Sequence, residues 1–386
     1  MLMLRKHFHC SWRNGRIYYN EMGSGMKIGK GGTWLKAIRI CLLLALMALL
    51  SPLCSTAGEY AEVTPSYAVK LPRDFYYKKD YKIQWWYFTG HLFDAQGREF
   101  GYELTFFTVG IQRRVYKSKF GLDNIYISHF AVSDVGGRKF YFTDRADRGA
   151  FAFAGASPGR LKVWVGKSIL DGTPRQMHIQ ASDKEIALDL ILTPEKPLVL
   201  NGENGYSRKS EDSPENASIY FTYPDLRTRG TLRTGGDTVS VSGKSWFDRE
   251  FSSKELSKRQ AGWDWFAIQL DDGRDIMLYV LRNKDGTIDP FSSGTFIHRN
   301  GTYRKLSKND YSVIAEGHYK SKTTGARYPS KWKVSIPSEG VSVTITPLIQ
   351  DQEVVSVYST GNYYWEGACK VEGTAQGRAY AELTGY

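Results

Sequence analysis

Two carboxylic acids, Asp248 and Glu250, lie two positions apart in the segment 243–253. On a β-strand, residues i and i+2 point to the same side, so the spacing predicts two carboxyls on one face. Paired carboxyls in an apolar pocket have their pKa values driven apart, so one can donate a proton while the other stays ionised. The pair therefore indicates acid/base catalysis. The alternative is that both carboxylates anchor arginine side chains at a junction between two domains.

Glu103 and His129 are further candidates for proton chemistry. Glu103 lies in a predicted strand, 100–107. If its face lines the inside of a barrel, Glu103 must be paired or protonated, because a bare buried charge is very costly. If it lies on the outer face, it is merely solvated. His129, in the predicted strand 125–132, has the pKa of a general base, and the alternative is a structural hydrogen bond to a neighbour.

Aromatic side chains accompany these groups. Trp263 and Trp265 share one face of a predicted strand, with Asp264 on the other. The sequence holds 25 Tyr and 10 Trp, and we interpret part of this set as the wall of a ligand pocket; the alternative is that they fill two cores and a domain interface. The predicted ligand-binding residues are Trp85, Tyr87, Trp246, Trp263, Trp265, Tyr279, Arg282 and Trp365.

Other kinds of catalysis lack their motifs in this sequence. It has no Gly-x-Ser-x-Gly nucleophile motif, and Cys369 has no histidine close by in sequence. No histidine spacing suggests a zinc site, and phosphate-binding glycine loops and dinucleotide fingerprints are absent. We therefore expect no serine-hydrolase mechanism, no metal and no cofactor.

The aromatic motif occurs twice. One copy begins at Trp85 and reaches a Gly-Arg turn after Leu92, and the other begins at Trp263 and reaches a similar turn after Leu270. The copies are offset by 178 residues at the tryptophans and by 176 at the turns. A repeat of this length is too long for a solenoid or a propeller blade, so it predicts a whole domain present twice.

Short alternating or aromatic runs, separated by Gly, Asn and Asp turns, predict an all-β chain. Residues 83–92 and 100–107 form one predicted hairpin, and residues 263–270 and 276–281 form its counterpart. About eight to ten strands per half fit either sandwiches or up-and-down barrels, and a Trp-bearing first strand that leads into a meander favours barrels. We predict a tandem pair of antiparallel β-barrels, over residues 58–243 and 244–386.

Residues 1–57 are expected to be a signal peptide with an over-extended start, cleaved after Ala57. Residues 40–50 are apolar, follow several basic residues and are too few to span a bilayer, so secretion to the periplasm without a lasting membrane span is expected. Met22 and Met26 are alternative starts, and Cys54 is an alternative lipidation site that Leu53 argues against. Without this leader the formal charge falls from +12 to +5 and no basic cluster remains, so no nucleic-acid partner is expected.

Four motifs together resemble the secreted AttH/CrtC-like family: residues 85–92, 243–253, 262–266 and 364–367. The resemblance extends from about residue 80 to the end of the sequence and implies two packed lipocalin-like barrels. The family includes carotenoid 1,2-hydratases, predicted secreted hydrolases and fungal decalin-forming pericyclases. Because one fold supports these different reactions, the resemblance implies the fold more strongly than the activity.

The chain departs from the family's hydratases beside Asp248. Those members tend to carry Asp-His-x-Trp, with the His and Trp taken to help protonate a double bond, whereas Arg249 and Phe251 occupy these places here. Arginine stays protonated and cannot shuttle a proton, so the departure argues against carotenoid hydration. It favours the bacterial periplasmic branch of the family, whose members are often encoded beside a lipoprotein-releasing type of exporter.

Three functions follow as hypotheses. The first is an exported enzyme that hydrolyses or hydrates a hydrophobic, isoprenoid-like or acyl-like molecule by acid/base chemistry. The second is a non-catalytic periplasmic carrier of such a ligand that works with an ABC exporter, which predicts a pocket without strained carboxylates. The third is a structural or interaction role with filled barrels.

Overall fold

The computed structural model describes residues 12–13, 16–17, 59–111, 113, 122–254 and 256–386. The chain divides into two compact units, Met1–Thr56 and Ala57–Tyr386. In the first unit, β1 (Trp12–Arg13) pairs with β2 (Arg16–Ile17). The predicted signal peptide, its cleavage after Ala57 and the alternative lipidation at Cys54 otherwise lie outside the described residues. Within the described residues, no helix has the length and apolar character needed to cross a membrane.

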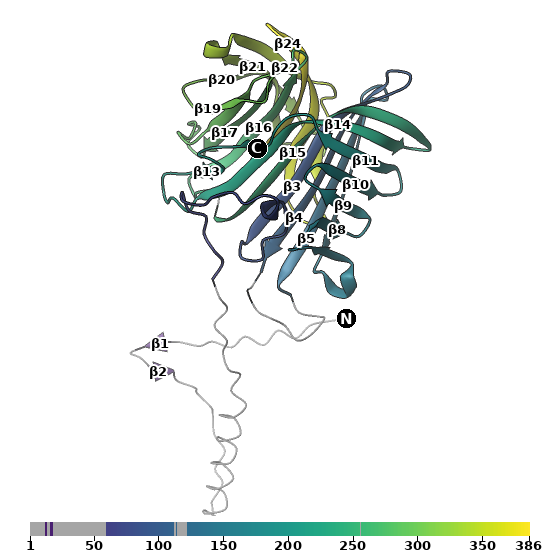
Figure 1. Cartoon of the computed structure of the whole chain (residues 1–386). Helices are drawn as coiled ribbons and strands as arrows, with labels where there is room; N and C mark the ends of the chain where they lie inside the picture. Colours follow the sequence, from purple (N-terminus) through teal and green to yellow (C-terminus); the bar gives the residue numbers. More distant parts are fainter. Residues whose placement is uncertain (1–11, 14–15, 18–58, 112, 114–121, 255) are drawn as a thin grey trace, which may run out of the picture. The chain divides into compact units, whose positions relative to one another are not determined.

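The second unit begins with an antiparallel sheet of 13 strands. Its hydrogen-bonded order is β6-β5-β4-β3-β15-β14-β11-β10-β9-β8-β7, with β12 and β13 paired to β14. Strand β8 lies close to β4, β5 and β6, so the sheet curls into a nearly closed barrel (Figure 1). The strands are β3 Ile83–Asp94, β4 Glu99–Gly110, β5 Asn124–Asp134, β6 Lys139–Asp147, β7 Ala154–Ala156, β8 Leu161–Val165, β9 Ser168–Thr173, β10 Gln176–Ser182, β11 Ile186–Pro194, β12 Val199–Leu200, β13 Tyr206–Arg208, β14 Ala217–Thr234 and β15 Asp237–Lys254.

A second antiparallel sheet of 10 strands forms a half-barrel beside the first. Its order is β19-β18-β17-β16-β25-β24-β22-β21-β20, with β23 paired to β24. The strands are β16 Gln260–Leu270, β17 Asp275–Asn283, β18 Ser293–Ile297, β19 Tyr303–Ser307, β20 Ser312–Lys320, β21 Arg327–Ile336, β22 Val341–Pro347, β23 Glu353–Val355, β24 Tyr363–Gly373 and β25 Gly377–Thr384. The helices of the described part are short 3₁₀ turns at Arg73–Phe75, Ala150–Ala152 and Pro337–Glu339.

The two sheets share one topology. In each, the Trp-bearing first strand pairs with the next strand and also with the last strand of the sheet: β3 with β4 and β15, and β16 with β17 and β25. In each, the chain of pairings is interrupted after the fourth strand, between β6 and β7 and between β19 and β20. Trp85 and Trp263 therefore hold equivalent places. The prediction of tandem antiparallel barrels is confirmed.

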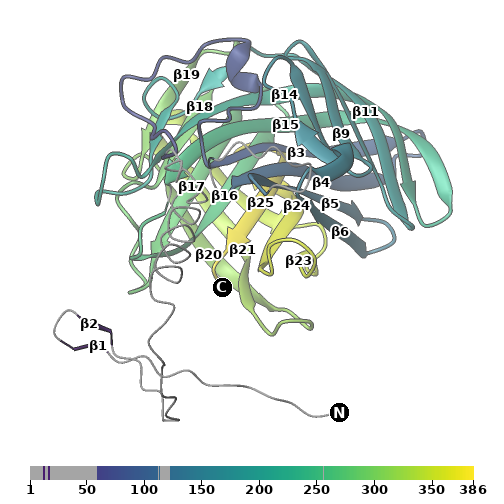
Figure 2. The same ribbon diagram turned by 90° about the horizontal axis from the view of Figure 1, so that it is seen from below.

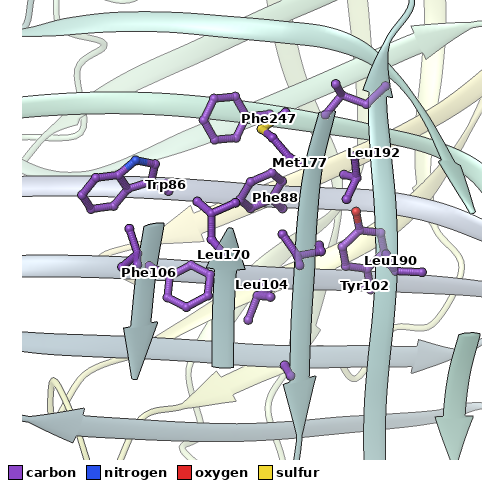
Figure 3. Close-up of a cluster of buried hydrophobic side chains, with 14 of the residues drawn as sticks. Trp86, Phe88, Tyr102, Leu104, Phe106, Leu170, Met177, Leu190, Leu192 and Phe247 are labelled. Atoms are coloured by element: carbon purple, nitrogen blue, oxygen red, sulfur yellow. The ribbon is translucent and has the colours of Figure 1, made fainter. Parts of the chain in front are cut away.

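Side chains on one face of the first sheet fill the barrel. Trp86, Phe88 and Leu92 alternate along β3 and are fully buried, as the two-residue period of a strand requires. They meet side chains from the opposite wall of the barrel, whose strands cross β3 in Figure 3: Leu170, Met177, Leu190 and Leu192. Side chains of the neighbouring strands β4 and β15 join the same core: Tyr102, Leu104, Phe106 and Phe247. Burial of each such side chain contributes roughly 1.5–3 kcal/mol, so this core stabilises the barrel.

The opposite face of the same strands packs against the second sheet. Tyr87 of β3 and Trp265 of β16 belong to one buried cluster, with ring centroids 5.1 Å apart. Polar contacts join the sheets beside this cluster: Arg378 Nε donates to Glu99 Oε1 at 2.6 Å, and Ser133 Oγ donates to Gln352 Oε1 at 2.6 Å. Seen from below, the strands of the two sheets lie side by side (Figure 2). Both faces of β3 and β16 are thus buried.

The change from one sheet to the other comes after the predicted domain boundary. Gly243 lies inside β15, whose whole length pairs with β14 and, from Val241 to Ser252, with β3. The second sheet starts at Gln260 with β16. The segment that carries Asp248 and Glu250 therefore belongs to the first sheet.

We predict that Gly243→Ala destabilises the protein, because an added Cβ would meet the carbonyl oxygen of His91 at 2.0 Å, where β15 pairs with β3. Overpacking of this kind lowers the free energy of unfolding by about 1–3 kcal/mol. Gly236→Ala is the matched control, because a Cβ at Gly236 has open space. Urea unfolding of both variants tests this. Equal stabilities would refute the close approach of the two strands.

Candidate active site between the two sheets

An apolar pocket of about 280 Å³ lies where the outer faces of the two sheets meet. Its wall comes from β3, β4, β14 and β15 of the first sheet and from β16, β17, β24 and β25 of the second. The lining residues are Ile83, Trp85, Tyr87, Thr105, Phe107, Lys209, Tyr220, Asp248, Glu250, Leu256, Trp263, Trp265, Tyr279, Leu281, Tyr364, Glu366 and Glu382. The pocket therefore lies in neither barrel interior.

Both copies of the aromatic motif contribute to this pocket. Trp85 and Tyr87 point into it from β3, and Trp263 and Trp265 point into it from β16, because residues two apart share a strand face. In each copy the first aromatic residue is partly exposed and the second is buried. The pocket wall is therefore built from equivalent positions of the repeat.

Asp248 is buried in the pocket wall and accepts three hydrogen bonds. Oδ2 accepts from the Tyr220 hydroxyl at 2.6 Å, and Oδ1 accepts from Thr222 at 2.5 Å and from the Trp246 indole at 2.8 Å. Desolvation outweighs these bonds and raises the pKa of Asp248 to about 7, with a smaller contribution from the charge of Glu250. Asp248 is therefore a carboxyl that exchanges a proton near neutral pH.

Glu250 has a counter-ion in the pocket. Lys209 Nζ lies 3.0 Å from Glu250 Oε1, and the Ser218 hydroxyl donates to the same oxygen. The ammonium lies 4.4 Å from the Tyr279 ring centroid and 5.1 Å from that of Tyr220. These cation–π contacts and the ion pair hold the Lys209 ammonium at the wall. The partner of Glu250 is thus a lysine, and not an arginine as the structural alternative supposed.

Glu382 is the counterpart of Asp248 in the second sheet. Asp248 is paired across the strands with Tyr87, and Glu382 is paired in the same way with Trp265, the equivalent residue of the repeat. Burial raises the pKa of Glu382 to about 8, against a lowering effect of a hydrogen bond from Trp263; the charges of Asp248 and Glu250 raise it further. Two symmetry-related carboxyls with pKa values near neutrality therefore face one pocket.

Two more carboxyls lie at the buried end of the site. Glu366, beside Glu382 on β24, accepts a hydrogen bond from the Tyr87 hydroxyl at 2.6 Å, and burial raises its pKa well above the ordinary value. Desolvation also raises the pKa of Glu103 strongly, against a smaller lowering effect of the Thr105 side chain. In both groups burial favours the protonated, neutral form of the carboxyl.

The structure brings most of the predicted site residues together. Trp85, Tyr87, Trp263, Trp265, Tyr279, Asp248 and Glu250 line the pocket. Trp246 lies behind it and supports Asp248. Glu103 faces the other sheet, so it lies neither in a barrel interior nor in solvent. His129 is separated from the pocket by Tyr364, whose hydroxyl lies 2.6 Å from His129 Nδ1.

Trp365 and Arg282, two further predicted residues, also lie outside the pocket wall. Trp365 belongs to the core of the second sheet, and its indole donates to Gln350 O at 2.8 Å. Arg282 pairs with Asp264 at 3.0 Å and stacks on Tyr386. Each lies one position away from a lining residue, and neighbours on a strand point to opposite faces.

The lining residues that the sequence did not predict include Lys209, Tyr220, Tyr364 and Glu382. Glu382 had a usable signal, because aligning the last strand of each half places it beside the aromatic motif, as Asp248 is placed in the first half. Lys209 follows the short strand β13 in an irregular segment, so no period could have indicated it. Among the described residues, no group of three His, Cys, Asp or Glu side chains is arranged to hold a metal ion.

Tandem lipocalin-like barrels with a carboxyl-bearing pocket between them define the class of protein. The model of the AttH-like family matches residues 62–386, and the chain belongs to this family, as the motifs predicted. A crystal structure of an AttH candidate from Nitrosomonas europaea is similar, with 34% identity, a TM-score of 0.77, and coverage of 84% of this chain and 99% of that chain. Kievitone hydratase from Nectria haematococca shares the fold at 14% identity, a TM-score of 0.63, and coverage of 85% and 97%. Dehydratase asqC from Emericella nidulans is 21% identical over 269 residues, which are 67% of this chain and 74% of that protein.

We predict that Glu382→Gln stabilises the protein at alkaline pH. The carboxyl ionises near 4.5 in the unfolded chain and at about 8 in the folded protein, so wild-type stability is full below pH 4.5 and is lost as the pH rises through 8. Allowing for partial exposure, the variant should gain roughly 2–4 kcal/mol at pH 9 and little at pH 4.

Denaturant unfolding across this pH range measures the effect. Glu372→Gln is the control, because Glu372 lies on β24 with its side chain exposed. A stability difference for Glu382→Gln that stays constant from pH 4 to 9 would contradict the raised pKa.

Proposed function

We propose that this protein is an acid/base enzyme of the hydratase or dehydratase type, which adds water to, or removes it from, a hydrophobic small molecule. The observation that carries the proposal is the pair Asp248 and Glu382, which face one apolar pocket with pKa values of about 7 and 8. General acid/base catalysis is most effective when the pKa lies near the working pH. The kievitone hydratase and dehydratase asqC similarities support the reaction class.

The order of the two pKa values suggests one role for each group. Near neutral pH, Asp248 has the lower pKa and acts as the base that takes a proton from carbon, while Glu382 donates its proton to the departing hydroxyl. The C–H and C–O bonds break, a C=C bond forms and water leaves; hydration is the reverse. Trp85, Trp263 and Trp265 supply the apolar wall against which such a substrate packs.

Arg249 and Phe251 have less bearing on this chemistry than the sequence suggested. Both point away from the pocket, into the first barrel: Phe251 belongs to its core, and the Arg249 guanidinium lies 4.0 Å from the Trp86 ring centroid. The departure from the hydratase pattern therefore leaves the acids of the pocket unchanged. The proposed substrate is a hydrophobic molecule, and the change to Arg249 and Phe251 does not identify its chemical class.

The raised pKa values also separate this proposal from the carrier alternative. A carrier predicts a pocket without strained carboxylates, whereas Asp248, Glu366 and Glu382 all face this pocket with raised pKa values. Secretion to the periplasm and work beside an ABC exporter stay predictions of the sequence.

The test is to incubate the purified protein with a hydrophobic extract of its own cells in H₂¹⁸O. Mass spectrometry then seeks pairs of compounds that differ by one water: hydration is recognised by ¹⁸O in the hydroxylated member, and dehydration by conversion of the hydroxylated member to the alkene. We expect activity to be highest between about pH 7 and 8, where Asp248 is ionised and Glu382 is protonated. Asp248→Asn and Glu382→Gln should each lower the rate by about 10²-fold or more.

Glu372→Gln should keep the parent rate, because its exposed side chain lies outside the pocket. A lipid that copurifies unchanged with the parent and with Asp248→Asn, without conversion between compounds that differ by one water, would refute the enzyme and favour the carrier.

A further inference from the structure

A continuous row of side chains crosses the outer face of the first sheet. Successive cross-strand pairs join Asp248 to Tyr87, Tyr87 to Thr105, Thr105 to His129, and His129 to Asp144. The row begins at the acid of the pocket on β15 and ends at β6, where Asp144 is partly exposed to solvent. The register of five neighbouring strands thus connects the buried site with the surface.

Hydrogen bonds link the outer part of this row to the second sheet. The Ser359 hydroxyl donates to Asp144 Oδ2 at 2.8 Å, and its oxygen lies 2.9 Å from His129 Nε2. His129 Nδ1 lies 2.6 Å from the hydroxyl of Tyr364, which lines the pocket. All three distances are ordinary for hydrogen bonds, so Asp144, Ser359, His129 and Tyr364 form one unbroken chain.

The partners fix the tautomer of His129. Ser359 uses its proton on Asp144, so its oxygen accepts from His129 Nε2–H. Nδ1 then carries the lone pair and accepts from the Tyr364 hydroxyl. Every donor in the chain points outward from the pocket, and the lone pairs of the Tyr364 oxygen remain available on the pocket side.

The surroundings keep the imidazole neutral. The rings of Phe107 and Phe142 pack edge-on against His129 at 5.2 and 5.5 Å, and Tyr364 stacks on it at 5.8 Å. Desolvation lowers the pKa of His129 to about 4, although the charge of Asp144 opposes this. A neutral imidazole with one donor and one acceptor nitrogen can pass a proton by switching tautomer.

We propose that Asp144, Ser359, His129 and Tyr364 form a proton relay that connects solvent with the buried carboxyls of the pocket. Tyr364 lines the pocket beside Glu366, from the same face of β24, and the charges of Glu103 and Glu366 act on its hydroxyl. Those two acids are fully buried, so their protons need a path through protein groups. His129 is therefore a positioning and relay residue that acts through Tyr364.

The transfer balances at every step. A proton from the pocket arrives at the Tyr364 oxygen as the hydroxyl proton of Tyr364 moves to His129 Nδ1. The Nε2 proton of His129 moves to the Ser359 oxygen, and the proton of Ser359 moves to Asp144, which exchanges it with water. Each relay group ends with its original number of protons, and one proton has left the pocket. The use of the relay in turnover rests on the proposed acid/base function, but its existence does not require a substrate.

The closing experiment is a rapid pH jump from 6 to 10 on the full-length protein, followed by infrared spectroscopy of the protonated-carboxyl band. We expect a slow phase from the buried acids. Tyr364→Phe should slow this phase about tenfold at unchanged final amplitude, because the ring still stacks while the hydroxyl is lost. Tyr363→Phe is the matched control, because the adjacent Tyr363 side chain is exposed.

A second variant breaks the relay in the half-exposed loop. Ser356 Oγ lies 3.4 Å from His129 Nε2 and 3.0 Å from Asp144 Oδ2, so it can replace Ser359, and the double change Ser356→Ala/Ser359→Ala is required. The double variant should slow the infrared phase of the buried acids, as Tyr364→Phe does. In parallel, ¹⁵N NMR of the wild type should show His129 as the Nε2–H tautomer at pH 7.

Equal relaxation rates in all variants, or an Nδ1–H tautomer, would overturn the relay. If the variants slow the relay phase but the parent protein interconverts no pair of compounds that differ by one water, the relay stands and the proposed function is refuted. If such a pair interconverts but all variants relax at the same rate, the proposed function stands and the relay is refuted.

Discussion

The structure depends on the two-residue alternation of side chains along strands that are buried on both faces. One face of β3 and β16 fills the interior of its own sheet, and the other packs against the partner sheet. This second face must be largely apolar, which explains the aromatic motif in both halves. The same packing removes water from the carboxyls that share the face. Desolvation, the largest cause of the raised pKa values of Asp248 and Glu382, thus follows from the contact between the sheets.

The sequence predicted the features that have a local period. Alternating residues and Gly-Asp turns marked the hairpins, the repeat marked the duplication, and the spacing of Asp248 and Glu250 placed both on one face. It could not predict which face of a strand lines the barrel interior and which packs against the other sheet, because a strand buried on both sides has no polar face to mark the outside. For this reason the sequence predicts either a barrel interior or a solvated outer face for Glu103, whereas the side chain is buried between the two sheets.

The other differences between the predicted site and the structure also arise from which face of a strand a side chain occupies or from contacts that form only on folding. The sequence predicts Trp365 as a ligand-binding residue, but its side chain lies on the opposite face of β24 from Tyr364 and Glu366. Arg249 was interpreted as a change in a catalytic motif, whereas it is a buried structural cation. Its guanidinium donates to Gln84 Oε1 and Tyr76 O at 2.9 Å, and burial lowers its pKa to about 9. Lys209 required the tertiary structure, since only folding brings it to Glu250.

Asp248 and Glu382 occupy matching places in the two halves, one from each copy of the duplicated domain. A dimer of identical ancestral domains would have placed the same residue at both places, with equal proton affinities by symmetry. Fusion of the two copies in one gene removes that equality, since each half then mutates independently. The aspartate in one half and the glutamate in the other differ in this way. A site built from two equivalent positions thus became chemically asymmetric, with a separate role open to each carboxyl.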